Sequence, residues 1–469
     1  MEERLENLVG HNSENFDWDF LIVRCEQLGV DFSELSTKYF KHPIYKKKKE
    51  AVLKLGGEVE YYYPTIMWGH NVLDSLHAAR RAQAIDSNMK SSNLKYVTKY
   101  LNLKKITESY REEILEAVTE VVDSGWFLQG EANRRFESHY ADYCGMSYCV
   151  GCANGLDALT ITLRSLIESG EMEKGDEVIV PANTYIATIL AITENHLKAV
   201  LVEPRKDTFQ IDDRKIEAAI TERTRAIMLV NLYGKNAFTP KVGKICLEHK
   251  LRLIVDNAQG HGLSLNYPDK LFPLPVVCHS FYPGKNLGAL GDGGAITTND
   301  KSLACIFRTL ANYGSSRKYH FDYCGRNSRL DELQAAILDV KLHHVNNENS
   351  YRHAIALRYI REIANPALTL PSETYWLNNV FHIFPILTKN RDSLQQYLTQ
   401  KGIQTMIHYP IPPHLQKCYA SSPLIVKPTK GLPVTEQIHN QELSLPCNSS
   451  MTYDEVSYII SVLNEWESL

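Results

Sequence analysis

Short apolar runs and longer amphipathic stretches alternate through the middle of the chain. The apolar runs cover residues 178–180, 199–202, 227–230, 253–255 and 276–277. Stretches of helical length lie between them, such as residues 212–220 and 239–249. Short buried strands that alternate with helices are typical of a largely parallel sheet covered by helices on both faces. The sequence therefore predicts an α/β fold for this part of the chain.

The first 93 residues have a different pattern. Residues recur at helical spacing in two places: Leu21, Cys25 and Leu28, and then Leu73, Leu76 and, less regularly, Arg80. This spacing predicts two or more short amphipathic helices. Residues 87–93 are small and polar without periodicity, as is typical of a linker. We therefore expect an N-terminal helical extension over residues 1–93, and its sequence predicts no chemistry.

Composition argues against several classes of protein. The 469 residues include 51 Lys or Arg and 55 Asp or Glu, a formal net charge of −4, so no general positive field attracts nucleic acid or an anionic membrane. No run of 18 apolar residues occurs, and acidic residues lie throughout the first thirty, which argues against a membrane span or a signal peptide. A cytoplasmic location is the resulting expectation.

Ten cysteines with a single C-x-x-C pair, Cys149 and Cys152, predict reduced thiols and no metal site.

Polar residues and glycines follow several of the predicted strands. Lys285 lies in a stretch with five glycines between apolar runs, and glycine lets a bound group come close to the backbone. Asp256 directly follows a buried strand, where a carboxylate needs a positive partner. Gly155 begins a predicted helix, and helix N-termini bind phosphate. Ser280 and Tyr185 also follow strands, and ligands bind at this edge of a parallel sheet.

These residues suit pyridoxal 5'-phosphate (PLP), which needs an amine for its aldehyde, a carboxylate for its pyridine nitrogen and donors for its phosphate. Nicotinamide enzymes use similar parts, but no G-x-G-x-x-G follows the first strand. Structural alternatives exist for single residues. Lys285 could lie in a solvated loop, Tyr185 could be a core aromatic, Gln259 could cap a turn, and Asn327 could bind backbone of its own chain.

Six ordered motifs between residue 101 and the C-terminus resemble those of the DegT/StrS group of nucleotide-sugar aminotransferases. They lie at residues 124–130 (SGWFLQG), 154–159 (NGLDAL), 256–259 (DNAQ), 280–285 (SFYPGK), 325–331 (GRNSRLD) and 408–410 (HYP). The resemblance implies PLP-dependent transferase fold type I. A large PLP-binding domain would then cover residues 94–364, and a small α+β domain residues 365–469. In the small domain, residues 380–387 predict a strand and residues 456–463 a helix.

The resemblance also implies the roles of four residues around a cofactor that alternates between PLP and pyridoxamine 5'-phosphate (PMP). Lys285 would bind the aldehyde covalently and later move the proton between the substrate α-carbon and the cofactor. Asp256 would pair with the pyridine nitrogen. Gln259 would lie near the phenolic oxygen of the cofactor, and Tyr185 would stack on its ring.

Binding of the cofactor phosphate is implied in the same way. The backbone at Gly155 and Leu156 and the hydroxyl of Ser280 would hold it. Asn327 would reach the same phosphate from the neighbouring subunit. The resemblance therefore implies a homodimer with shared active sites, and neither nucleic acid nor membrane is an expected partner.

Lysine at position 285 favours amino transfer, because related enzymes that dehydrate a sugar have histidine there. By family habit L-glutamate gives the amino group, and a nucleotide-linked keto sugar accepts it. Gln259 and the sequences of residues 154–157 and 282–288 most resemble those of the branch that converts dTDP-3-keto-6-deoxyhexoses into dTDP-3-amino-3,6-dideoxyhexoses. The branch that aminates 4-keto sugars, including perosamine-type enzymes, is the alternative.

Four residues are candidates for contacts with the sugar nucleotide: Tyr313, His320, His408 and Tyr409. The family pattern has histidine at position 321, where this chain has phenylalanine, so the contact expected of His320 is in question. The pair at 408 and 409 could also belong to a loop held by prolines. Two other interpretations are a non-catalytic PLP-binding regulator and an enzyme fused to the remnant of a neighbouring pathway enzyme.

Overall fold

The computed structural model describes residues 98–265, 267, 274–372, 375 and 377–467, together with six short strands nearer the N-terminus. By their contacts, the residues divide into two units. One unit contains residues 1–99 and 392–404, and the other contains residues 100–391 and 405–469. The predicted domain boundaries at 93 and 364 remain predictions.

The described N-terminal residues form strands. They are β1 (Val9–Gly10), β2 (Ile44–Lys46), β3 (Ala51–Leu55), β4 (Glu58–Tyr62), β5 (Thr65–Met67) and β6 (Leu73–Asp74). The prediction of a helix from Leu73 is wrong at its first residues, because Leu73 and Asp74 form β6, which pairs in parallel with β1. A short apolar spacing is a weak signal, and pairing with a segment more distant in sequence overrides it. The helix predicted at Leu21–Leu28 lies outside the described residues.

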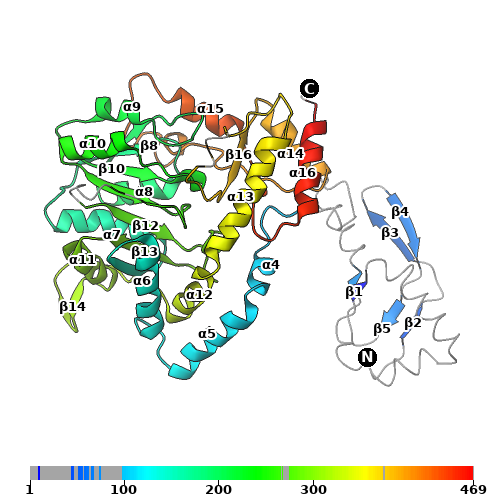
Figure 1. Cartoon of the computed structure of the whole chain (residues 1–469), viewed down its shortest axis with the longest axis horizontal. Coiled ribbons are helices and arrows are strands. Elements are labelled where there is room, and N and C mark those ends of the chain that lie inside the picture. Colours follow the sequence, from blue (N-terminus) through cyan, green and yellow to red (C-terminus); the bar gives the residue numbers. More distant parts are fainter. Residues whose placement is uncertain are drawn as a thin grey trace. The chain divides into compact units, whose positions relative to one another are not determined.

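An eight-stranded sheet forms the centre of the second unit, with the strand order β17-β9-β8-β10-β11-β12-β13-β7 (Figure 1). In chain order the strands are β7 (Tyr148–Cys152), β8 (Glu177–Pro181), β9 (Lys198–Val202), β10 (Thr224–Val230), β11 (Arg252–Asp256), β12 (Val276–Ser280), β13 (Gly294–Thr298) and β17 (Ile425–Val426). Only β13 runs antiparallel to its neighbours. The prediction of a mostly parallel α/β sheet is confirmed, and each apolar run lies in a strand.

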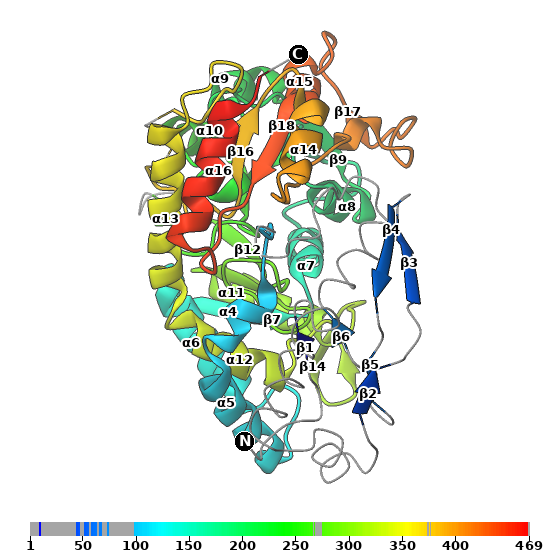
Figure 2. The same cartoon turned by 90° about the vertical axis from the view of Figure 1, so that its right-hand side faces the viewer.

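Helices cover both faces of the sheet (Figures 1 and 2). Along β8, Val178 and Val180 pack towards one face, while Ile179 packs towards the other. The first face is covered by α7 (Gly155–Glu168), α8 (Ile186–Glu194) and α11 (Lys301–Ala311). The second is covered by α9 (Asp213–Ile216) and α10 (Pro240–His249) and, near β7, by α5 (Arg111–Ser124), α6 (Glu131–Cys144) and α12 (Glu332–Leu342).

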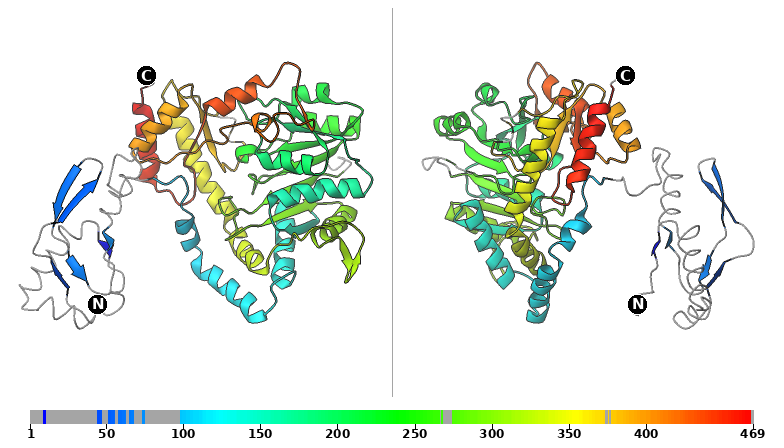
Figure 3. Two further views of the ribbon diagram at one scale, coloured as in Figure 1. Left: turned by 180° about the vertical axis from the view of Figure 1, so that it is seen from behind. Right: turned by 45° about the vertical axis from the view of Figure 1, so that its right-hand side comes forward.

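The C-terminal elements add a smaller layer. They include α13 (Val345–Glu362), β16 (Phe384–Leu387), α15 (Pro433–Gln441), β18 (Glu442–Leu445) and α16 (Tyr453–Glu465), with α13 beside α16 (Figure 3). The strand predicted over 380–387 begins only at Phe384, because the chain turns through positive φ angles at Asn378 and Phe381. Among the described residues, none of the helices is long and apolar enough to cross a membrane.

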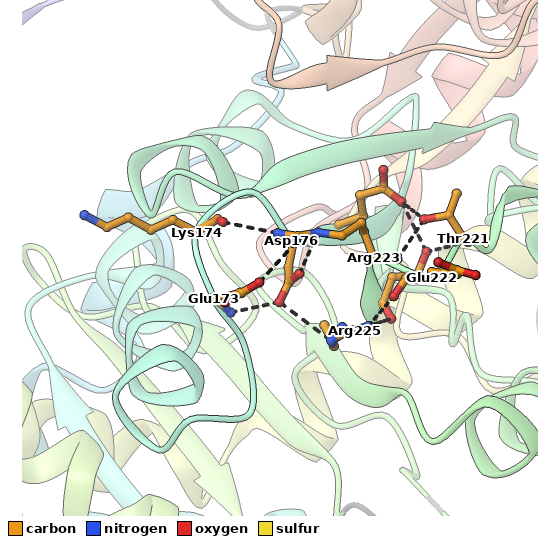
Figure 4. A network of polar contacts seen from close by, with 9 residues as sticks. Glu173, Lys174, Asp176, Thr221, Glu222, Arg223 and Arg225 are labelled. Carbon is orange, nitrogen blue, oxygen red and sulfur yellow. Dashed lines mark hydrogen bonds and ion pairs between the residues drawn. The ribbon is translucent and has the colours of Figure 1, made fainter.

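A charged network joins the starts of β8 and β10 (Figure 4). Asp176 is 1% exposed and accepts the Glu173 N–H at 2.8 Å. The Nε atoms of Arg223 and Arg225 lie 3.2 and 3.7 Å from its carboxylate oxygens. These ion pairs hold the amino ends of the two strands together. The carboxyl ends, at the opposite edge, are left for polar residues that line a cavity.

Candidate active site

A cavity of about 710 Å³ lies in the second unit. It lies at the carboxyl ends of the parallel strands, where Asp256 ends β11 and Ser280 ends β12. Nine of the predicted site residues line it: Gly155, Leu156, Tyr185, Asp256, Gln259, Ser280, Lys285, His408 and Tyr409. Residues from distant parts of the sequence therefore meet at one edge of the sheet.

Asp256 and Lys285 are the two charged groups at the base of this cavity. The Thr188 hydroxyl donates to Asp256 Oδ2 at 2.8 Å, and the Ala258 N–H donates to Oδ1 at 3.2 Å. Burial nevertheless raises the pKa of the Asp256 carboxyl. Burial also lowers the pKa of the Lys285 amine to about 8, against the opposing effect of the Asp256 charge. The loss of hydration therefore outweighs the attraction between the two groups, and a cation between them would stabilise the carboxylate.

The start of α7 faces the same cavity. Asn154 caps the helix by accepting the Asp157 N–H at 2.8 Å, which leaves the preceding N–H groups of Gly155 and Leu156 for a ligand. A Cβ at Gly155 would lie 2.5 Å from the Cβ of Ser280. Glycine thus allows the hydroxyl of Ser280 to lie beside the helix start. A helix N-terminus with an adjacent hydroxyl fits a phosphate group.

Aromatic residues form another wall. The ring centroids of Tyr185 and Tyr409 are 4.8 Å apart, and Tyr185 is 50% exposed, so it is not a core aromatic. Gln259 donates through Nε2 to the Tyr409 hydroxyl at 3.1 Å and accepts the Tyr233 N–H at 2.5 Å. Gln259 therefore orients Tyr409 as well as lining the cavity. Together with the amine, the acid and the phosphate-sized helix start, this wall fits the ring and substituents of PLP.

A buried carboxyl that sequence reasoning missed supports His408. Glu442 on β18 accepts the His408 N–H at 2.6 Å and also accepts the Ser444 hydroxyl. His408 Nδ1 lies 2.8 Å from Ser444 Oγ. Ser444 therefore links the His408 ring to the Glu442 carboxyl. Burial and the Lys285 charge lower the pKa of His408 to about 4, while burial raises that of Glu442 to about 8.

Three predicted residues do not line the cavity of their own chain. Tyr313 is half exposed. His320 lies in an exposed hairpin made of β14 (Ser315–Arg317) and β15 (His320–Phe321). Asn327 is exposed and bridges to Asn312. Arg352 and His382 also line the cavity, and the sequence analysis had no signal for either of these ionisable residues.

Comparisons with known proteins agree with this geometry. The model of the DegT/DnrJ/EryC1/StrS aminotransferase family matches residues 108–464. The dTDP-3-amino-3,6-dideoxy-alpha-D-galactopyranose transaminase of Aneurinibacillus thermoaerophilus is 46% identical over 384 residues, which cover 78% of this chain and 99% of that protein.

Solved structures agree as well. The crystal structure of S. venezuelae DesV is 39% identical, with a TM-score of 0.74 over 79% of this chain and 98% of that one. The structure of Bacillus subtilis NtdA with bound PMP is 30% identical, with a TM-score of 0.71 over 85% of this chain and 94% of that one.

Proposed function

This chain belongs to the DegT/DnrJ/EryC1/StrS aminotransferase family, whose members use PLP, and we propose that it transfers an amino group from L-glutamate to a dTDP-linked 3-keto-6-deoxyhexose. The product would be a dTDP-3-amino-3,6-dideoxyhexose. One observation carries the proposal: Lys285 and Asp256 meet in a cavity at the strand ends, in a chain 46% identical to a transaminase for a sugar of that class.

Residues around the cavity would hold the cofactor. The N–H groups of Gly155 and Leu156 and the Ser280 hydroxyl would bind its phosphate. The Asp256 carboxylate would accept a hydrogen bond from the protonated pyridine nitrogen, and the positive charge there would offset the cost of burying the acid. Lys285 would bind the aldehyde. Bound PLP supplies an electron-withdrawing ring.

Two further residues would position the ring. Tyr185 would pack against its face, as its half-exposed side chain on the cavity wall allows. Gln259 would lie near the phenolic oxygen of the cofactor while holding Tyr409. His408 and Tyr409 would then face the sugar nucleotide.

Proton transfer falls to Lys285. An amine with a pKa of about 8 is neutral in a useful fraction of molecules near neutral pH. In that form its Nζ would accept a proton from the α-carbon of the bound substrate and hold it for return. A lysine with an ordinary pKa would be almost wholly protonated and would act poorly as a base.

A second copy of the chain would complete the site. Large apolar side chains are exposed on and after α5, among them Leu115 at 49%, Val122 at 53%, Trp126 at 64% and Phe127 at 51%, and such a patch is typical of a protein interface. Asn327 would then bind the cofactor phosphate of the partner's site. The exposure of this residue outside its own cavity supports the homodimer.

The absorbance spectrum of the purified protein tests the function. We expect L-glutamate to remove the long-wavelength band of the lysine-bound cofactor, and a dTDP-3-keto-6-deoxyhexose to restore it. Lys285→Ala should show neither change, while Lys104→Ala, at a side chain 85% exposed, should behave like the wild type. A bound cofactor that glutamate leaves unchanged would indicate a non-catalytic PLP-binding regulator. Restoration only by a 4-keto sugar would show that the sugar class is wrong.

A further inference from the structure

Arg352 is a buried cation in the wall of the cavity. It lies in the middle of α13 and is 3% exposed. Its Nη1 donates to the carbonyl oxygen of Cys447. Its Nε is buried and has no hydrogen-bond partner among the described residues. Within the described part of the chain, the guanidinium also makes no ion pair, although four of its five N–H groups remain after the bond to Cys447.

No acid forms a direct ion pair with Arg352 in the described part of the chain, although the nearby charge of Glu348 opposes the lowering of the Arg352 pKa by burial. Glu348, one turn earlier on α13, instead accepts the Tyr110 hydroxyl at 2.7 Å. Asp256, in the same cavity, accepts from Thr188 and Ala258. A buried cation without a direct ion pair is costly, and here the effect of burial exceeds that of the nearby acid. An anion that enters the cavity would remove this cost and use the unpaired donors.

We propose that Arg352 binds a carboxylate of the amino-acid donor, an inference that rests on the proposed function. A guanidinium presents parallel N–H groups that match the two oxygens of a carboxylate. The site is also near the reacting amine, because Lys285, His382 and Arg352 line the same cavity. The charges of Lys285 and Arg352 both add to the effect of burial in lowering the pKa of His382.

Burial selects the carboxylate over the diphosphate of the sugar nucleotide. A side chain that is 3% exposed can be reached by a small group at the end of a short chain. A diphosphate carries a nucleoside on one side and a sugar on the other, so it needs a more open site. L-Glutamate carries each of its two carboxylates at the end of a short chain, as such a site requires.

The holoenzyme with Arg352→Gln and Arg352→Lys tests this assignment. Arg358→Gln is the matched control, because Arg358 lies on the same helix but outside the cavity and pairs with Glu362. Two quantities are measured: the rate of the glutamate half reaction against glutamate concentration, and the affinities for 2-oxoglutarate and for dTDP by calorimetry.

We expect Arg352→Gln to lower both the glutamate rate at limiting concentration and the affinity for 2-oxoglutarate on the order of 10- to 100-fold, the loss of one or two charge-assisted hydrogen bonds. Arg352→Lys should recover part of this loss, and dTDP affinity should stay within about twofold. Unchanged glutamate kinetics, or a loss confined to dTDP, would overturn the inference. A wild-type enzyme that does not react with glutamate would instead refute the proposed function.

Discussion

The reactivity of Lys285 can be predicted from its surroundings before any cofactor is added. Burial lowers its pKa to about 8, and the negative charge of Asp256 opposes that shift. At pH 7, an amine of pKa 8 is neutral in about one molecule in ten, against about one in three thousand for an ordinary lysine of pKa 10.5. Lys285 should therefore offer about 300 times more neutral amine than an exposed lysine at this pH.

Trace labelling of the apoenzyme with acetic anhydride measures this fraction. The label on Lys285 is quantified by mass spectrometry between pH 6 and pH 10, with the exposed Lys104 as an internal reference. We expect half-maximal labelling of Lys285 near pH 8. Asp256→Asn should move that midpoint to lower pH, because it removes the charge that raises the pKa.

Two results would refute this reasoning. A Lys285 midpoint that follows the reference lysine would show that burial does not control the amine. A midpoint that rises in Asp256→Asn would show that the acid does not stabilise the protonated form. Reagent access is not limiting, because the cavity of about 710 Å³ admits a molecule as small as acetic anhydride.

Two substitutions away from the reacting amine test the sheet and the phosphate site. Asp176→Asn removes the buried charge between two arginines (Figure 4). It should lower the free energy of unfolding, measured in urea, by about 2 kcal/mol. Glu248→Gln breaks an exposed ion pair and should change the free energy of unfolding by less than about 0.5 kcal/mol. Equal effects would contradict the role of burial. Gly155→Ala would place a Cβ 2.5 Å from the Cβ of Ser280 and should weaken PLP binding at least about tenfold. Gly284→Ala is the control, because its Cβ would have no contact under 3.4 Å, and it should leave PLP binding unchanged. A normal PLP affinity in Gly155→Ala would contradict the close approach of Gly155 and Ser280.

Local sequence rules predicted the sheet and several residues that line the cavity. Asp256 and Ser280 could be assigned to strand ends because each directly follows an apolar run, and parallel strands bring their carboxyl ends to one edge. Gly155 could be assigned to a helix start because a small polar turn precedes an amphipathic stretch. These rules need only neighbouring residues, so one sequence was enough.

Arg352 shows why other cavity residues could not be predicted. Its helix, α13, contains mostly polar residues over its first two turns, which is typical of a solvent-exposed face. The carbonyl of Cys447, 95 residues later, defines its position, and no local pattern reports such a contact. Similarly, Asn327 does not line the cavity of its own chain, and its role in the site of a partner subunit remains a prediction.

The residues that hold His408 in place show the same limit of local sequence rules. Glu442 and Ser444 alternate with Leu443 and Leu445 along β18, a pattern typical of a strand with one polar face in water. In the structure both polar residues are fully buried, because the segment containing His408 covers that face and hydrogen-bonds to it. The alternation of polar and apolar residues therefore does not distinguish a strand face exposed to water from one that packs against a cavity residue. What distinguishes them is that the polar groups of β18 hydrogen-bond to one another and to His408, and this bonding holds His408 at the wall of the cavity.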